Sequence, residues 1–163
     1  MPVVCLHLPQ PQLDIARLAH PDLRGRAVVL LDRAGPDATV TARSPEAALL
    51  GVHPGMVARQ ACGRAPGAVF LRDTGDRVED MILAASEGIR RDGAGVPETG
   101  RDWIAVHTGH LVAASRVLDA AASLEGMTIL VGRGASVEEA LNAARAARPH
   151  PRASRALSGR RAS

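Results

Sequence analysis

Residues 40–71 read VTARSPEAALLGVHPGMVARQACGRAPGAVFL, and this stretch predicts a strand, two short helices and a second strand. The first strand is the β-prone run 40–42. Ser44 is suited to N-cap a helix over residues 46–50, because its hydroxyl can accept a hydrogen bond from the first helical turn and Pro45 fits the first helical position.

The second half of the stretch predicts a tight turn, another helix and the closing strand. The turn covers residues 52–55, where Pro54 presets φ and Gly55 permits a positive φ. A helix then starts near Met56, and the next strand covers residues 69–71. Spacing alone is typical of an ordinary α/β connection.

Strand and helix patterns alternate along the rest of the chain. Short apolar runs predict strands, and apolar residues at helical spacing predict helices. We expect strands at 3–8, 27–31, 103–106 and 127–131, and helices at 13–19, 74–91, 111–124 and 136–147. Residues 92–100 are rich in Gly and Pro and are expected to be a linker. The alternation predicts an α/β fold, with a single mixed sheet and helices packed on it.

Composition limits the class of protein. A chain of 163 residues suits one domain, whose core must be built from aliphatic residues because aromatic residues make up 1%. All 20 basic residues are Arg, which with the high Ala content indicates a GC-rich bacterial genome. Cys5 and Cys62 have no metal or redox spacing and are expected to be buried, reduced thiols. The sequence has no membrane-spanning run and no export leader, so we expect a cytoplasmic protein associated with the nucleoid.

Charge is distributed unevenly. The net charge is +3, but residues 145–163 hold six Arg and no acid, which leaves −3 on residues 1–144. Residues 151–163 have little to bury and are expected to form a disordered Arg-rich tail. Because phosphate contacts need clustered positive charge, we expect weak, nonspecific DNA binding by the C-terminal arginines. These are Arg148, Arg152, Arg155, Arg160 and Arg161.

Several motifs together resemble the palm and fingers of Y-family DNA polymerases, the translesion class. SPEAALLGVHPGM, followed by A-x-x-x-x-P-G and a strand, resembles the fingers segment. PDLRGRAVV (21–29) resembles the segment that leads into the second palm strand, and residues 127–149 resemble the last palm strand and helix. The opening VVCLHLPQPQLD (3–14) is most similar to ImuB-type proteins, polymerase-like mutasome subunits of the UmuC-domain class that have lost the catalytic carboxylates.

The resemblance implies a palm-like domain over residues 1–150, with a small helical fingers insertion at about 33–75. The family's activity is DNA-directed DNA synthesis, which uses two Mg²⁺ ions held by carboxylates. On the first strand, the family's Asp pair matches His7 and Pro9; on a later strand, its Asp-Glu pair matches Asp102 and Trp103. Only one carboxylate remains. We therefore expect no catalytic residues, no bound metal and no cofactor.

Other family positions are also changed. The aromatic residue that excludes ribonucleotides would lie near Pro11 or Gln12. The Tyr and Arg that hold the triphosphate would match Pro45 and Ala48. The family's basic-Pro element persists as Arg148-Pro149. ImuB-type proteins lose the same groups, so these losses agree with that resemblance.

Other sites and functions remain open from the sequence. His7, Asp102 and His107, with His110 nearby, could form the site of a small metal-dependent hydrolase, although this spacing is no known zinc signature. Gly132-Arg133-Gly134 before a helix could bind phosphate, but a lone G-x-G is a weak signal. Trp103 is expected to be a core residue more than a base-stacking platform.

The favoured hypothesis is a catalytically inactive Y-family polymerase-like protein. It would act in DNA repair or translesion synthesis as a protein-interaction and weak DNA-binding module. By resemblance, its partners would be repair or replication proteins of the mutasome or sliding-clamp type, with no membrane. The alternative is a decayed remnant of such a polymerase without independent activity.

Overall fold

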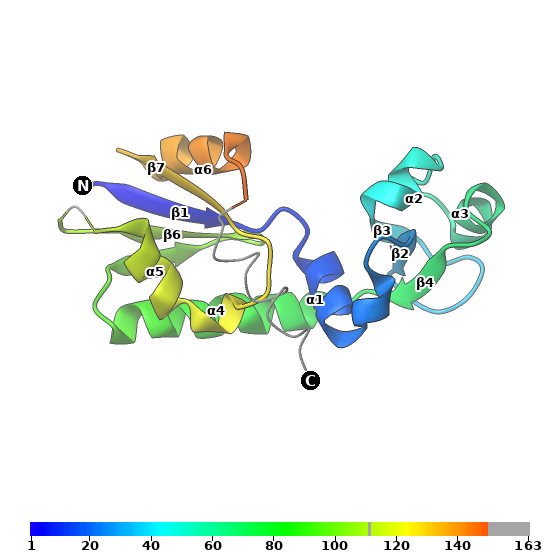
Figure 1. The fold of residues 1–163 in the computed structure, drawn as a ribbon, viewed down its shortest axis with the longest axis horizontal. Helices are drawn as coiled ribbons and strands as arrows, with labels where there is room; N and C mark the ends of the chain where they lie inside the picture. The colour runs from blue at the N-terminus through cyan, green and yellow to red at the C-terminus, as the bar shows by residue number, and fades with distance from the viewer. Residues whose placement is uncertain (111, 150–163) are drawn as a thin grey trace. The chain divides into compact units, whose positions relative to one another are not determined.

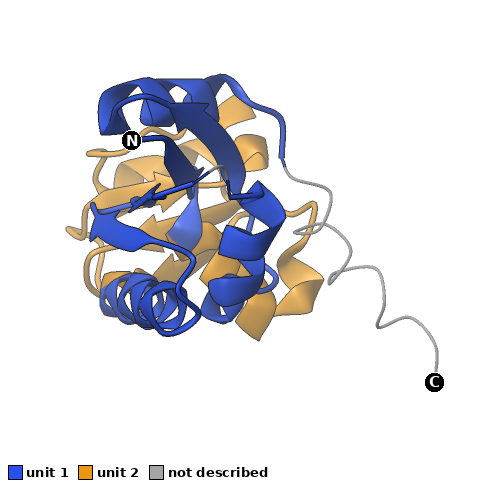
Figure 2. Cartoon of the chain, turned by 90° about the vertical axis from the view of Figure 1, so that its left-hand side faces the viewer, with its two compact units in different colours: residues 1–11, 76–163 blue, residues 12–75 orange. Residues whose placement is uncertain are grey.

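The computed structural model describes residues 1–110 and 112–149 (Figure 1). They divide into two compact units, coloured separately in Figure 2. The first unit comprises Met1–Pro11 and residues 76–149, and the second comprises Gln12–Gly75. The predicted tail, 151–163, lies outside the described residues. Among the helices within them, none has the length and apolar character needed to cross a membrane.

The first unit contains a four-stranded sheet. Its strands are β1 (Val3–His7), β5 (Val96–Thr99), β6 (Trp103–His107) and β7 (Leu130–Gly134). Their order is β5-β6-β1-β7, and each neighbouring pair is antiparallel. All five residues of β1 are buried, as expected for a central strand with both faces covered.

Helices cover both faces of this sheet (Figure 1). They are α4 (Gly75–Arg91), α5 (Ala114–Ala120), the 3₁₀ helix η2 (Ala122–Leu124) and α6 (Val137–Ala146). On one face, Ala140 and Ala144 of α6 pack against Val3, Cys5 and Ala105 of the strands. Figure 1 shows α4 and α5 on the other face. The predicted α/β architecture is thus present in this unit.

Two glycines bring β7 close to α6. A Cβ at Gly132 would overlap the backbone of Ala140 and Ala144, and one at Gly134 would overlap Glu139 and Ala140. These glycines therefore serve helix–strand packing and lie within the strand itself. The weak G-x-G signal at residues 132–134 therefore has a packing explanation rather than a phosphate-binding one.

The N-terminus of α6 is capped as the sequence predicts. The Ser136 hydroxyl accepts a hydrogen bond from the Glu139 N–H at 3.2 Å. The Glu139 carboxylate in turn accepts one from the Ala135 N–H at 2.9 Å. One donor of the first helical turn, the Glu139 N–H, and the N–H of Ala135 just before the cap are thereby satisfied.

The second unit has a three-stranded sheet of its own. Its strands are β2 (Val28–Leu31), β3 (Val40–Arg43) and β4 (Val69–Arg72). In the order β3-β2-β4, β2 is antiparallel to β3 and parallel to β4, and a bulge lies between Leu30 and Leu31. The helical elements are α1 (Pro11–Ala19), the 3₁₀ helix η1 (Pro21–Leu23), α2 (Pro45–Leu49) and α3 (Ala58–Arg64).

β2 is buried on both faces, as predicted from its continuous apolar sequence. Val29 and Leu31 pack in one cluster with Val40, Ala47, Val52, Ala58 and Ala61. Val28 and Leu30 pack in another with Leu13 and Leu23. The strand thus separates two small aliphatic cores, and helices α2 and α3 contribute to the first of them.

Ser44 ties this unit together. It is fully buried, and its hydroxyl accepts hydrogen bonds from the N–H groups of Val28, at 2.9 Å, and Ala47, at 3.3 Å. The same hydroxyl donates to the Arg26 carbonyl at 3.3 Å. The predicted N-cap of α2 is confirmed, and it also joins the start of α2 to the start of β2.

The structure corrects the expected single mixed sheet, because the described strands form two sheets. Alternating strands and helices fix the class of fold, but they do not say which strands pair. The strands at 28–31, 40–43 and 69–72 bond to one another, and no hydrogen bond in the described ranges joins them to β1 or β6.

Element boundaries in the first unit also differ from the prediction. The expected linker 92–100 contains β5, where Pro97 is tolerated because β5 is an edge strand. The helix expected at 111–124 is α5 followed by η2, and Leu111 is not among the described residues. The strand expected at 127–131 lies at 130–134 as β7.

Replacing the buried serine tests its role. Ser44→Ala should lower the free energy of unfolding by about 1–3 kcal/mol, since it leaves the buried Val28 N–H without its acceptor. Ser136→Ala removes an exposed N-cap and should cost less, about 0.5–1 kcal/mol. Urea unfolding of both variants checks this, and equal costs would contradict the bridging role of Ser44.

Candidate functional site

The sequence-predicted site residues meet where β1 ends and β6 begins. In the antiparallel register His7 lies opposite Trp103, so Asp102 comes beside the end of β1. The Leu8 N–H donates to the Asp102 carbonyl at 2.8 Å, which extends this pairing by one residue. The pairing of β1 with β6 therefore brings His7 and Asp102 together.

The His7 imidazole and the Asp102 carboxylate face each other without a hydrogen bond. His7 Nδ1 and Asp102 Oδ2 are 3.9 Å apart, beyond hydrogen-bond length. The histidine side chain is 10% exposed and that of the aspartate 37%. Within the described residues, the buried Nδ1 has no hydrogen-bond partner. The contact is a loose pair of one imidazole and one half-exposed carboxylate.

Trp103 fills the space next to this pair. It is half-buried and packs against the cluster of Val3, Cys5 and Ala105 beneath α6. A Cβ at Gly100 would overlap the indole, so the ring lies directly against that glycine. Trp103 thus packs on the core cluster as expected, but it is half-buried at the margin of the core rather than inside it.

The donor atoms at this site do not fit a pair of Mg²⁺ ions. Magnesium takes oxygen ligands, and two-metal sites hold ions about 3.5–4 Å apart with shared carboxylates. Here His7 offers nitrogen, Pro9 offers no side-chain donor, and Asp102 supplies one carboxylate. In the described ranges, no group of three or more His, Cys, Asp or Glu side chains could hold a metal ion.

The alternative hydrolase site is not assembled. His107 lies opposite Val3, at the other end of the β1–β6 pair from His7. Four strand residues separate the two positions, about 13 Å. His107 Nε2 instead lies 3.3 Å from the Glu98 carboxylate on β5, and His110 is exposed in the bend after β6. His7 therefore lies next to Asp102, whereas His107 lies at the opposite end of the strand pair, next to Glu98.

The remaining predicted positions are exposed or lie outside the described part. Arg148 is exposed two residues after α6 ends, whereas Arg152, Arg155, Arg160 and Arg161 are not among the described residues. In the second unit, Pro45 occupies the first turn of α2 and Ala48 follows one turn later. Neither offers a polar side chain to a triphosphate.

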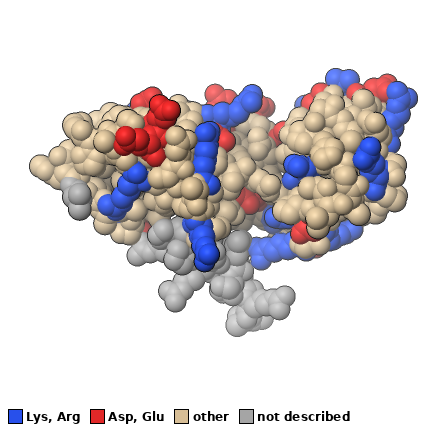
Figure 3. Space-filling model, turned by 90° about the horizontal axis from the view of Figure 1, so that it is seen from above, with Lys and Arg blue, Asp and Glu red and all other residues tan. Residues whose placement is uncertain are grey.

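Charge differs between the two units, which the linear pattern did not reveal. Gln12–Gly75 has eight Arg and six acids, a net charge of +2. Residues 1–11 and 76–149 have eight Arg and eleven acids, a net charge of −3. Figure 3 shows acidic side chains gathered over α6 and basic ones spread over the second unit. This difference in net charge can be counted only when the boundaries of the two units are known.

Solved structures similar to this chain include Y-family polymerases. The post-insertion binary complex of Dbh DNA polymerase matches with a TM-score of 0.76, and its insertion ternary complex with 0.75, both at 19% sequence identity. DinB from Sulfolobus solfataricus matches with 0.73, also at 19% identity. The fold is that of the N-terminal part of Y-family DNA polymerases.

These matches cover 91% of this chain and 46–47% of the polymerase chains, so the chain spans about half their length. No family model matches the sequence, and no curated protein does. The predicted resemblance is therefore confirmed at the level of the fold.

The two cysteines lie in different environments. Cys5 is fully buried on β1, and burial raises the pKa of its thiol from 9.0 to about 11, with Arg145 opposing the shift and Asp102 adding to it. Cys62 on α3 is exposed. The expectation that both thiols are buried is thus wrong for Cys62, which lies on the outer side of a short amphipathic helix.

Thiol reactivity should separate the two residues. Because the thiolate is the nucleophile, native protein at pH 8 should react quickly with one equivalent of a disulfide reagent, at Cys62. Cys5 should react only after denaturation, since its thiol stays protonated and covered. Absorbance titration of Cys62→Ser should show no fast phase. A fast phase in that variant would contradict the burial of Cys5.

Proposed function

We propose that this chain is a catalytically inactive, Y-family polymerase-like protein of DNA repair or translesion synthesis. It acts through protein contacts and weak DNA binding rather than nucleotide transfer. One observation carries the proposal: within the polymerase fold, the end of β1 and the start of β6 present His7, Pro9, Asp102 and Trp103. By resemblance, these are the positions of metal-binding acids.

Electrostatics explains why this set is insufficient for the family's reaction. Two divalent ions bring four positive charges close together, and only surrounding carboxylates and substrate phosphates offset their repulsion. Asp102 contributes one negative charge, and its carboxylate is half-exposed. The Trp103 indole next to it is held by packing against Cys5, Ala105 and Gly100. A single carboxylate in water binds Mg²⁺ too weakly to organise a triphosphate.

The ImuB-type resemblance supports a protein-interaction role. In that class the catalytic groups are lost while the fold is kept, and the losses at Pro45 and Ala48 follow the same pattern. By that resemblance, the partners are repair or replication proteins of the mutasome or sliding-clamp type. The intact aliphatic cores around Val29 and Cys5 argue against the decayed-remnant alternative, because unselected chains accumulate polar residues in their cores.

Primer extension tests the loss of activity. The full chain should add no nucleotide to a primed template with Mg²⁺ or Mn²⁺, because the metal ligands are absent from the positions where the family holds them. Asp102→Ala serves as the matched control for contaminating polymerase. Extension by the wild type that Asp102→Ala abolishes would refute the proposal, whereas extension that both proteins share would identify a contaminant.

DNA binding is expected to depend on the arginines after residue 149. Four of them follow that residue without any acid, whereas residues 1–11 and 76–149 carry −3. Each phosphate neutralised on duplex DNA contributes about −0.9 to the slope of log K against log salt. With three to five contacts, made by these four arginines and Arg148, the slope should be about −3 to −4.5, and the dissociation constant no tighter than roughly micromolar at physiological salt.

Replacing the four arginines by Ala should remove most of this affinity and flatten the salt dependence. The change covers Arg152, Arg155, Arg160 and Arg161. A chain with residues 150–163 in shuffled order keeps the charge and should keep the slope, since the attraction is independent of sequence. Fluorescence anisotropy at several salt concentrations measures both. Undiminished binding by the Arg-to-Ala variant would show that the folded units bind DNA themselves.

A further inference from the structure

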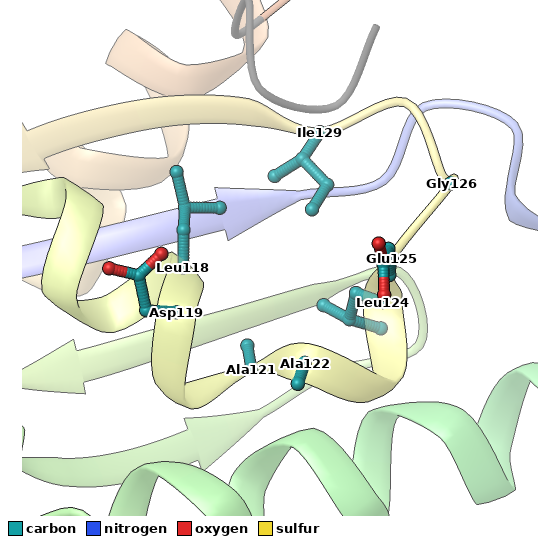
Figure 4. A pocket seen from close by; sticks show the side chains of 8 residues that line it. All are labelled: Leu118, Asp119, Ala121, Ala122, Leu124, Glu125, Gly126 and Ile129. Carbon is teal, nitrogen blue, oxygen red and sulfur yellow. The ribbon is translucent and has the colours of Figure 1, made fainter. Parts of the chain in front are cut away.

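A small apolar pocket with acidic ends lies on the first unit (Figure 4). Its volume is about 220 Å³, and it is formed by α5, η2 and the segment that leads into β7. Leu118, Leu124 and Ile129 supply the apolar lining. Figure 4 shows the Asp119 and Glu125 carboxylates at its two ends.

The size and chemistry of the pocket restrict what can bind there. Sites for drug-sized ligands span about 300–1,000 Å³, so this pocket suits a side chain rather than a whole small molecule. Its apolar lining fits an aliphatic side chain, or the stem of an arginine whose guanidinium reaches a carboxylate. Asp119 and Glu125 would repel phosphate, so the occupant is not a nucleotide or DNA.

The chain supplies a segment of complementary chemistry. Residues 150–163 carry four Arg and no acid, and Leu157 lies between Arg155 and the Arg160-Arg161 pair. The same polypeptide therefore contains an apolar pocket with acidic ends and a segment rich in Arg that includes a Leu. A tethered partner also has a high effective concentration, so weak contacts suffice for binding.

The packing of α6 on β7 places the C-terminal end of the helix beside the start of β7, which follows the pocket residue Ile129. Gly134 lies against Ala140, and Gly132 lies against both Ala140 and Ala144, so the helix runs back along the strand. Beyond Ala144 the helix continues for two residues, about 3 Å, and three further residues add up to about 10 Å. A path of that length along the strand would reach the level of Ile129, about 10 Å before Gly132.

The position of β7 leaves this route open. β7 is the edge strand of the four-stranded sheet, so the chain can pass around its edge to the side of α5 and η2. The fourteen residues of 150–163 span at most about 46–50 Å when extended. Reach is therefore no obstacle to docking on the same molecule.

We propose that residues 150–163 bind intramolecularly to this pocket, with Leu157 or an Arg stem in the apolar part and guanidinium groups at Asp119 and Glu125. The inference goes beyond the proposed role in DNA repair and does not depend on it. In this arrangement the C-terminal segment covers the apolar surface of the pocket next to the sheet edge.

Paramagnetic relaxation enhancement in the full chain tests the proposal. A nitroxide label is attached at Ser158→Cys in a Cys62→Ser background, where buried Cys5 stays unmodified. Methyl signals of Leu118, Leu124 and Ile129 should broaden strongly at low salt. The Val96 methyls, on the opposite edge strand, serve as the internal reference and should broaden much less.

The double variant Asp119→Asn/Glu125→Gln should lower the ratio of docked to free segment roughly fivefold, since two weak surface ion pairs are together worth about that factor. Glu79→Gln/Glu87→Gln removes the same charge from the exposed side of α4 and should leave the broadening unchanged. Pocket methyls that broaden no more than Val96, or broadening that survives Asp119→Asn/Glu125→Gln, would overturn the proposal.

A mixing experiment shows whether the segment docks on its own chain or on a second copy. One copy carries the spin label and no isotopes, and the other carries isotopes and no spin label. The proposal predicts no broadening in the mixture, because the segment docks on its own chain. Equal broadening in the mixture would overturn it and assign the occupant to a second copy.

Discussion

The antiparallel register of β1 with β6 is the constraint on which the interpretation of the site depends. It places His7 opposite Trp103 and brings Asp102 beside the end of β1. It also sends His107 to the far end of the same strand pair, where it contacts Glu98. A shift of one residue would exchange the two faces of the strand. Because β1 is buried on both sides, packing against α6 and the opposite face holds this register.

Two kinds of close contact position the helices relative to the strands. In the first unit, Gly132 and Gly134 let α6 approach β7 closely, which covers the sheet face that carries Cys5 and Trp103. In the second unit, the buried Ser44 hydroxyl joins the start of α2 to the start of β2. With almost no aromatic residues, the protein relies on close backbone approach and buried hydrogen bonds instead of large side chains.

Local features were readable from the sequence, and pairings over long distances were not. The Ser44 and Ser136 caps were predictable, because a cap is decided within four residues. The Val28 N–H as a second partner of Ser44 was not, since sixteen residues separate them. The strand β5 was not predicted, because it contains Pro97 and a proline argues against a strand unless the strand lies at an edge of the sheet. Gly132 suggested a phosphate loop, because the reason for a glycine depends on what packs against it.

We propose that the chain combines a Y-family polymerase-like fold with a β1–β6 strand end that cannot hold two metal ions. Mn²⁺ titration followed by electron paramagnetic resonance tests it most directly, since free and bound Mn²⁺ give different signals and no DNA or nucleotide is needed. We expect no saturable Mn²⁺ site that Asp102→Asn removes, because Asp102 is the single carboxylate beside His7 at the end of β1. Tight binding of two Mn²⁺ ions per chain, lost in Asp102→Asn, would contradict it.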